Sequence, residues 1–309
     1  MQLSLGDLRL FVAVAELANL TRAAERVHLS LTATSTRIRA IEVQVGLPLL
    51  QRQARGVKLT PAGKTFAHHA RRMLLQADTL RNELWEEYGD GPQGHVRVFA
   101  NTTAVTEFLP QILSSFLAAY PRISVGLKEQ ASHEIARGVR ERRADIGIAA
   151  GAMDCLGLTA FHFATDRLVL VCARNHRLAR RAQMAFAEVL DEAMVGMHEG
   201  STIERFLARV VEDMGLPALK RRVQVCSFDA MCRMVEVGVG LGILPESAAL
   251  RYQSAGMEIA LVKLADDWAL RERFLLTHED QRLPPYAQEL IERICAHHGT
   301  AWVATPPRR

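Results

Sequence analysis

The stretch from Leu20 to Glu42 constrains the fold more than any other part of the chain, because it predicts two short helices that meet at a tight turn. Thr21 is placed to cap the first helix, since its hydroxyl can accept an otherwise unpaired backbone N–H group. Ser30 is placed to cap the second helix in the same way. Apolar residues recur at steps of three and four in this second helix, which indicates one buried stripe: Ile38, Ile41 and Val45.

The opposite side of the second helix carries short hydroxyl groups and guanidinium groups. Hydroxyls reach phosphates and base edges, and an arginine can bind guanine through two hydrogen bonds, so this face suits the major groove of DNA. The pattern is typical of a helix-turn-helix whose second helix reads the DNA. We expect the contacts to come from Thr32, Ser35, Thr36, Arg37 and Arg39, with Thr21 and Ser30 at the helix starts.

A short hairpin follows the two helices. Its strands are predicted within residues 49–60, with a turn near Arg55 and Gly56. Arg52, Arg55 and Lys58 cluster on it, which predicts a basic wing along the sugar–phosphate backbone. Such contacts fix the register of a protein on DNA and carry little sequence information.

A long helix is predicted from residue 61 to about residue 88, with Thr60 as its cap and a Gly-Asp-Gly-Pro stop at residues 89–92. Its apolar residues recur at steps of three and four, and a helix of this length needs a partner for that stripe. A symmetric dimer would supply one and would place two DNA-reading units on neighbouring turns of the duplex. Packing of the helix against the body of its own chain is the alternative.

Charge separates the start of the chain from the remainder. Of the 38 Lys and Arg and 34 Asp and Glu in the chain, the first 72 residues hold 11 and 4, which gives +7 there and −3 elsewhere. A basic segment joined to a slightly acidic body is typical of a protein that contacts phosphates at one end. A solvated basic face is the alternative.

Length and composition place the chain in a broad class. Its 309 residues suit two or three domains, and no window approaches the ~18 consecutive apolar residues of a membrane span. The first residues lack the basic and cleavable regions of a secretion signal. Five cysteines without C-x-x-C spacing favour reduced thiols in a cytosol. The sequence therefore predicts a cytoplasmic protein with no membrane partner.

Strands alternate with helices from residue 93 onward, which predicts an α/β body with parallel sheets and helices on both faces. We expect strands at residues 95–100, 122–130, 144–149, 167–173, 194–197, 223–226 and 273–278. We expect helices at residues 106–120, up to about 142, 201–214, 228–237 and 284–298. Gly238 to Gly242 superficially matches a dinucleotide-binding loop, but it follows a helix, and Pro245 predicts that no helix opens after it, so we expect no dinucleotide cofactor.

Several long blocks, in the right order, resemble the LysR-type transcriptional regulators over nearly the whole chain. They are LRLFVAVAELANLTRAAERVHLS, RIRAIE, LPLLQRQARGVKLTPAG, ISVGLKEQASHEI, RADIGIAAG, DRLVLVCARNHRLA and SFDAMCRMVEVGVGLGILP. The resemblance implies a winged helix-turn-helix (residues 1–60), a linker helix for dimerisation (61–92) and a periplasmic-binding-protein-like effector domain (93–309). In that domain lobe I would span about residues 93–163 and 266–309, and lobe II about 164–265.

The resemblance also implies homodimers or homotetramers and a promoter controlled by a small metabolite. Leu31 and Thr32 stand where the family commonly has Gln-Pro, and Thr34 stands where a buried Leu or Val is usual. Leu50 and Gln51 replace a common Phe-Glu beside the wing. These departures concern the operator sequence rather than the mode of docking.

The effector should lie between the lobes, at strand ends and helix starts, where unpaired N–H groups and the helix dipole favour an anion. Asn101, Thr102 and Thr103 match the family's first ligand-contacting segment. Further candidates that we place around the same crevice are Gln130, Ser132, Ser201, Thr202, Phe228 and Asp229. For each of them a plain helix cap is the alternative. A carboxylate such as Asp229 or Glu199 would repel an anion or pair with a cationic group, whereas family habit favours a small carboxylate or aromatic acid.

Two other classes of protein compete with a ligand-responsive DNA-binding regulator. A solute-binding protein could use the first helices only for dimerisation, and salt-sensitive DNA binding would distinguish the two. An enzyme is the second, but no paired carboxylates, metal-ligand cluster or nucleophile triad can be assembled from the sequence. We therefore expect no catalytic activity, no metal and no cofactor.

Overall fold

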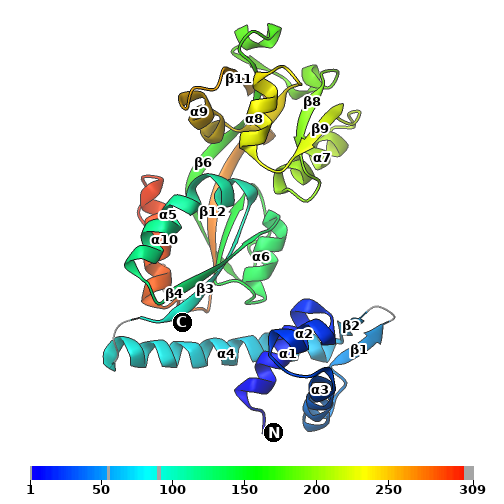
Figure 1. Cartoon of the computed structure of the whole chain (residues 1–309), viewed down its shortest axis with the longest axis vertical. Coiled ribbons are helices and arrows are strands. Elements are labelled where there is room, and N and C mark those ends of the chain that lie inside the picture. Colours follow the sequence, from blue (N-terminus) through cyan, green and yellow to red (C-terminus); the bar gives the residue numbers. More distant parts are fainter. Residues whose placement is uncertain (1, 54–55, 89–91, 303–309) are drawn as a thin grey trace. The chain divides into compact units, whose positions relative to one another are not determined.

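The structure is a computed structural model that describes residues 2–53, 56–88 and 92–302. The chain divides into two compact units (Figure 1). The first comprises residues 1–94 with 141–143, and the second comprises residues 95–140 with 144–309. Among the described residues, no helix combines the length and the apolar character that crossing a membrane requires.

The first unit contains four helices and a hairpin among its described residues. In chain order they are α1 (Leu5–Leu17), α2 (Leu20–Arg26), α3 (Leu31–Val45), β1 (Leu50–Gln53), β2 (Gly56–Leu59) and α4 (Pro61–Tyr88). Leu10, Phe11 and Val14 of α1 are buried against Ile38 and Ile41 of α3, so the apolar stripe predicted on the second helix does face a core. The predicted helix pair, hairpin and long helix are thereby confirmed as elements.

The ends of these helices follow the expected cap chemistry, with one exception. Ser30 Oγ accepts a hydrogen bond from the N–H of Ala33 at 3.1 Å and caps α3, as predicted. Thr60 caps α4 in the same way, through the N–H of Gly63 at 2.9 Å. The prediction for Thr21 is wrong, because Asn19 holds the cap position of α2.

Asn19 takes that position because its side chain reaches the right donor. Its Oδ1 accepts from the N–H of Arg22 at 3.1 Å, while its own backbone is extended. Asparagine is as effective a cap as serine or threonine. Thr21 therefore lies inside the helix, exposed to solvent.

The second unit is built on a mixed sheet, with the strand order β4-β3-β5-β12-β6-β11-β7 and with β10 paired to β6. Its strands are β3 (Gly94–Ala100), β4 (Ile123–Glu129), β5 (Ile146–Ala150), β6 (Leu158–Ala173), β7 (Gln183–Met184), β10 (Gly242–Pro245), β11 (Ile259–Leu264) and β12 (Leu270–His278). A separate parallel pair is formed by β8 (Met194–Met197) and β9 (Arg221–Val225).

The expectation of purely parallel sheets is wrong. β5 is parallel to β3, but β12 is antiparallel to both β5 and β6, and β11 and β10 are antiparallel to β6. The cause is the 16-residue strand β6, which the sequence pattern predicted only from residue 167. It runs through the whole unit, and β12 returns beside it in the opposite direction (Figure 1).

Helices cover both faces of the sheet in the first part of this unit. They are α5 (Leu109–Ala119), α6 (Ser132–Arg140) and α10 (Pro285–His297), and a short π-helical turn (Ala104–Phe108) precedes α5. Alternate residues of a strand point to opposite faces, so Val98 packs toward α5 and α10 whereas Phe99 packs toward α6. This alternation confirms the prediction of helices on both faces.

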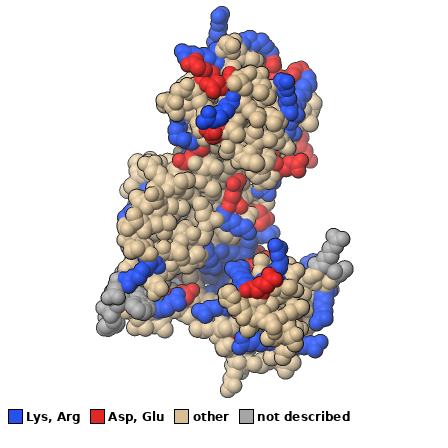
Figure 2. All heavy atoms as spheres, in the orientation of Figure 1, with Lys and Arg blue, Asp and Glu red and all other residues tan. Residues whose placement is uncertain are grey.

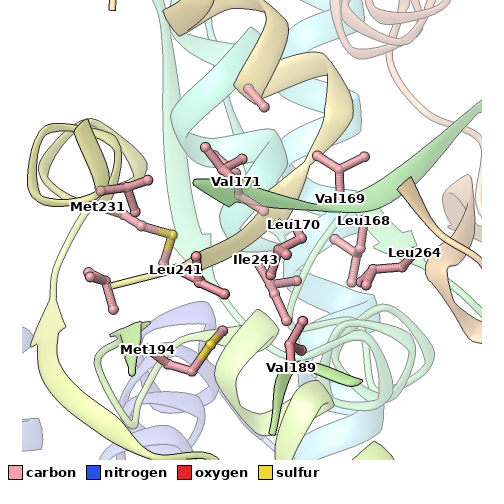
Figure 3. Packing of buried hydrophobic residues seen from close by; sticks show 14 of the residues in the cluster. Leu168, Val169, Leu170, Val171, Val189, Met194, Met231, Leu241, Ile243 and Leu264 are labelled. Carbon is pink, nitrogen blue, oxygen red and sulfur yellow. The ribbon is translucent and has the colours of Figure 1, made fainter. Parts of the chain in front are cut away.

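A second hydrophobic core lies in the part of this unit formed by residues 168–269. Around it pack α7 (Thr202–Asp213), α8 (Phe228–Glu236) and α9 (Glu246–Ser254). Figure 3 shows Leu170 and Val171 of β6 packed beside Ile243 and Met231. Phe163 of β6 belongs instead to the core around α5 and α10, so the two long strands connect two separate cores.

The glycine-rich segment before β10 does not have the predicted outcome. Pro245 is the cap residue of α9, which begins at Glu246, so the expectation that no helix follows is wrong. Proline needs no hydrogen-bond partner for its nitrogen and therefore suits a helix start. The order of elements is helix, glycines, strand, which still differs from the strand-glycines-helix order of a dinucleotide loop.

Candidate functional site

The polar face of α3 points away from the core of the first unit. Thr32, Thr36, Arg37 and Arg39 are exposed, and Ser35 is half-buried. Thr34 is fully buried on the other side of the helix. Lys and Arg side chains are visible on the surface of this unit in Figure 2. The structure thus brings the predicted α3 residues together on an outward surface.

The two arginines of this face differ in their surroundings. Arg37 Nε lies 3.5 Å from Asp7 Oδ1, although 48% of the arginine side chain is exposed. Asp7 also accepts a hydrogen bond from Ser4 Oγ at 2.7 Å and belongs to the capping box of α1. The hydrogen bond from Ser4 lowers the pKa of Asp7, and the charge of Arg37 adds to this effect. Within the described part of the chain, Arg39 has no acidic group within 4 Å.

The hairpin distributes its basic residues over two faces. Arg52 pairs with Val57 across the ladder, and Lys58 pairs with Gln51. Directly opposed residues of an antiparallel ladder share a face, and successive residues alternate. Arg52 and Lys58 are both exposed but therefore leave opposite faces, so the predicted single basic cluster is not what the register produces. Arg55 lies outside the described residues.

The second unit contains a cavity of about 400 Å³. It lies where β3, β6 and β12 meet the starts of α6 and α7. Four of the nine predicted effector residues line it, namely Asn101, Thr103, Ser132 and Thr202. The cavity thus lies at strand ends and helix starts, as the sequence predicted.

Thr102 does not line the cavity but closes one side of it. Its Oγ1 lies 2.8 Å from Thr202 Oγ1, and each threonine hydroxyl accepts the backbone N–H of the other, at 3.3 and 3.2 Å. Thr102 Oγ1 also donates to Glu129 Oε1 at 2.5 Å. The N–H groups that were expected to be unpaired and open to an anion are therefore already hydrogen-bonded, beside a carboxylate.

The other four predicted effector residues lie away from the cavity lining. Ser201 is buried and caps α7 through the N–H of Glu204, which is the plain-cap alternative. Phe228 is fully buried in the core of residues 168–269. Asp229 pairs with Arg233 at 2.9 Å, and Gln130 donates its backbone N–H to the carbonyl of Ala100.

The cavity is lined by several residues that the sequence did not single out. The most polar of them are Asp166, Arg209, Asp213, Arg271 and Arg273, and the aromatic ones are Phe206 and Trp268. Arg271 and Arg273 are two residues apart in β12 and so lie on the same face. Charged residues at alternate positions of an otherwise apolar strand were the available signal.

The buried charges of the cavity form one neutralised group. Arg273 and Asp166 are each less than a tenth exposed and form an ion pair. Ser247 donates its hydroxyl to Asp166 Oδ2 at 2.6 Å, and the N–H of Arg167 donates to Oδ1 at 2.8 Å. Burial lowers the pKa of Arg273, although the nearby carboxylate of Asp166 opposes that shift. Four donors thus saturate the Asp166 carboxylate, the fourth being the N–H of Ser247.

Comparison with known proteins agrees with this architecture. Residues 5–64 match the model of the bacterial regulatory helix-turn-helix protein, lysR family, and residues 89–298 match the LysR substrate binding domain. The HTH-type transcriptional regulator CysL of Bacillus subtilis is 26% identical over 271 residues, which cover 88% of this chain and 89% of CysL.

Two solved structures share the fold. A full-length OxyR from Pseudomonas aeruginosa aligns with a TM-score of 0.67 at 20% identity, over 98% of this chain and all of that one. The regulatory domain of CcmR from Synechocystis PCC6803, solved in complex with 2-PG, aligns with a TM-score of 0.55 at 22% identity, over 67% of this chain and 98% of that one. The two family models together span most of the chain, from the helix-turn-helix to α10. The chain therefore belongs to the LysR family of transcriptional regulators.

Proposed function

We propose that this regulator binds operator DNA with the outward face of α3 and that a small molecule in the cavity of the second unit changes that binding. The observation that carries the DNA half is the exposed face of hydroxyls and guanidiniums on a helix whose other side is buried. A protein with this role works where promoter DNA is, so the cytoplasmic location belongs to the same proposal.

The contacts to DNA divide by chemistry. We assign base contacts to residues of α3 and backbone contacts to the helix starts and the wing. The proposed base-reading residues are Thr32, Ser35, Thr36 and Arg39. The proposed backbone-binding residues are Thr21, Ser30, Arg37, Arg52, Arg55 and Lys58. Arg37 moves to the second group because its ion pair with Asp7 competes with a base contact.

The effector half rests on the size and position of the cavity. A volume of about 400 Å³ is typical of a site for a small organic molecule. The related fold of the CcmR regulatory domain was solved with a small ligand, 2-PG, which supports a ligand in this chain without identifying it. The proposed lobe I (residues 93–163 and 266–309) and lobe II (164–265) agree with the two hydrophobic cores that β6 and β12 connect.

Coupling between the two sites has to be reciprocal. If the effector changes operator affinity by some factor, the operator must change effector affinity by the same factor. We propose that the ligand shifts a pre-existing equilibrium between arrangements of the oligomer. The resulting change in the bend or spacing of the operator would alter transcription.

A footprint upstream of the protein's own gene, followed by a variant pair, tests the DNA half. Arg39→Ala should weaken operator binding by ~1–3 kcal/mol if the guanidinium contacts a base. Arg180→Ala is the matched control, because it removes the same charge from an exposed position of the second unit. Equal operator affinity for Arg39→Ala and wild type would remove α3 from the interface.

The solute-binding alternative makes a different prediction for DNA. A protein that neutralises phosphates loses affinity steeply as salt rises, because counterions are released on binding. Filter binding of random-sequence DNA across a salt series therefore separates the two classes. Absence of salt-dependent binding would favour the solute-binding protein.

A further inference from the structure

Arg271 carries a charge in the cavity that the protein itself does not neutralise. Its guanidinium donates one hydrogen bond, to the carbonyl oxygen of Ala150 at 3.0 Å. No carboxylate of the described residues lies within 4 Å of it. One face of the guanidinium is covered by the ring of Phe206, with 3.8 Å between Cζ and the ring centroid. The remaining N–H groups have no acceptor within the described chain.

The surroundings of Arg271 make this charge expensive. Burial lowers its pKa to about 10, and the nearby charge of Arg209 lowers it further. A half-buried cation is normally paired, because its desolvation is costly without a partner. Arg209 is exposed and lies four residues before Asp213 on α7, so Asp213 offsets the outer arginine rather than Arg271.

No other part of the cavity competes for an anion. The ion pair with Asp166 already neutralises Arg273. At the helix starts, Thr102 and Thr202 satisfy each other's N–H groups, and Glu129 adds a negative charge there. The excess positive charge of the cavity is therefore concentrated at Arg271.

The wall beside Arg271 is apolar and flat. Phe206 and Trp268 pack against each other with ring centroids 5.8 Å apart. Leu168, Ile203 and Pro245 complete the apolar lining. Such a surface suits a planar hydrophobic body, while a planar guanidinium edge suits a carboxylate that accepts two hydrogen bonds.

The geometry points to a specific class of effector, an organic anion with one carboxylate on a flat apolar body, whose carboxylate pairs with Arg271 while its body lies against Phe206 and Trp268. Arg271 is then the specificity-determining residue, which separates carboxylates from neutral molecules of the same shape. This inference rests on the proposed effector role of the cavity and names the chemistry that the cavity selects.

Isothermal titration of the full chain with three probes of one shape tests it. The probes are benzoate, neutral benzamide and cationic benzylammonium. Wild type should bind benzoate, and bind benzamide about tenfold or more weakly, because benzamide leaves the buried charge unpaired. Arg271→Gln should abolish most of this preference, and Arg271→Lys should retain part of it because lysine keeps the charge without the fork.

Arg205→Gln is the matched control, because Arg205 is an exposed arginine of α7 outside the cavity lining. It should leave all three affinities unchanged. Should Arg271→Gln fail to fold, the wild-type order of the probes and the exposed variant Arg209→Gln decide the question, since Arg209→Gln should weaken benzoate alone.

Three results would overturn the inference. These are no benzoate binding by wild type, benzamide or benzylammonium binding as tightly as benzoate, and an unchanged preference in folded Arg271→Gln. Operator binding distinguishes this failure from failure of the proposed function. If the footprint persists while benzoate is rejected, the regulator stands and only the effector class is wrong.

Discussion

Thr34 illustrates how one atom can work against the stability of the DNA-binding unit. The residue is fully buried under α3, and its Oγ1 has no hydrogen-bond partner among the described residues. A buried hydroxyl without a partner loses its bonds to water and gains nothing in return. At this position the resemblance to LysR-type regulators leads one to expect an apolar side chain.

Replacing Thr34 with Val should therefore stabilise the protein. Valine has nearly the same shape and lacks the unpaired hydroxyl, so the free energy of unfolding should rise by ~1 kcal/mol. Urea unfolding monitored by circular dichroism measures the change. Thr36→Val, at an exposed position of the same helix, is the control and should have little effect. A lower unfolding midpoint for Thr34→Val would show that the hydroxyl has a role we have not identified.

His298 provides a pH-dependent contribution to stability. It packs edge-on against Phe108 and Phe163, and its Nε2 is buried with no partner in the described chain. Burial lowers its pKa to about 4, and the nearby charge of Arg273 adds to the shift. The folded state thus holds the ring neutral at pH values where the unfolded chain binds a proton.

The sign of the effect follows from this difference. Between pH 6.5, the ordinary value for the group, and about 4, the unfolded state binds more protons, so the free energy of unfolding falls as the pH falls. The loss should be on the order of 2 kcal/mol, because the ring is only partly buried. His298→Leu should show a flatter dependence across that window in urea titrations. Parallel curves for variant and wild type would contradict the assignment.

At the scale of elements, the start of α2 depends on a cap that was predicted at the wrong residue. Asn19 satisfies the N–H of Arg22, whereas Thr21 lies exposed within the helix. The hydroxyl of Thr21 had the right chemistry, but Asn19 stands two residues earlier with equal capping ability. Only the backbone conformation shows which of the two lies at the boundary.

Two alanine substitutions should separate these roles. Asn19→Ala should lower the free energy of unfolding by ~1 kcal/mol, because it removes the cap of α2. Thr21→Ala should have a much smaller effect, since alanine is a better helix former and no cap is lost. Thermal unfolding of the two variants decides between the assignments. The reverse order of stabilities would restore Thr21 as the cap.

At the scale of the whole molecule, α4 offers a surface that its own unit does not use. Near its start, Phe66 packs against Phe11 with ring centroids 4.7 Å apart, so that part of the stripe belongs to the core of the first unit. Farther along, Met73, Leu80 and Leu84 are each more than half exposed. Exposed apolar residues at helical spacing indicate an interface, and we propose that a second copy of the chain covers them.

The double variant Leu80→Lys with Leu84→Lys should weaken that assembly. Burying two ammonium groups in an apolar interface is unfavourable, so the sedimentation coefficient should fall toward that of a smaller species. Operator affinity should fall as well, because two linked DNA-reading units bind more tightly than one. Leu80→Met with Leu84→Met keeps the surface apolar and is the control. An unchanged sedimentation coefficient for the lysine variant would place the interface elsewhere.

The sequence by itself determined the local elements and the order of the domains. Ser30, Thr60 and Gly46 mark helix ends through short-range hydrogen bonds and backbone conformation, and these depend on residues only a few positions apart. The same holds for the buried stripe of α3 and for the strand ends that carry Asn101 and Ser132. Local chemistry is readable from local sequence.

Only the tertiary structure decided which side chains meet in the cavity and which charges are neutralised there. Asp166 and Arg273 are 107 positions apart, and the antiparallel return of β12 beside β6 is what places them together. The same packing leaves Arg271 without a carboxylate and joins Thr102 to Thr202. Pairing over such distances depends on strand register and on how the two cores pack, neither of which a local pattern contains.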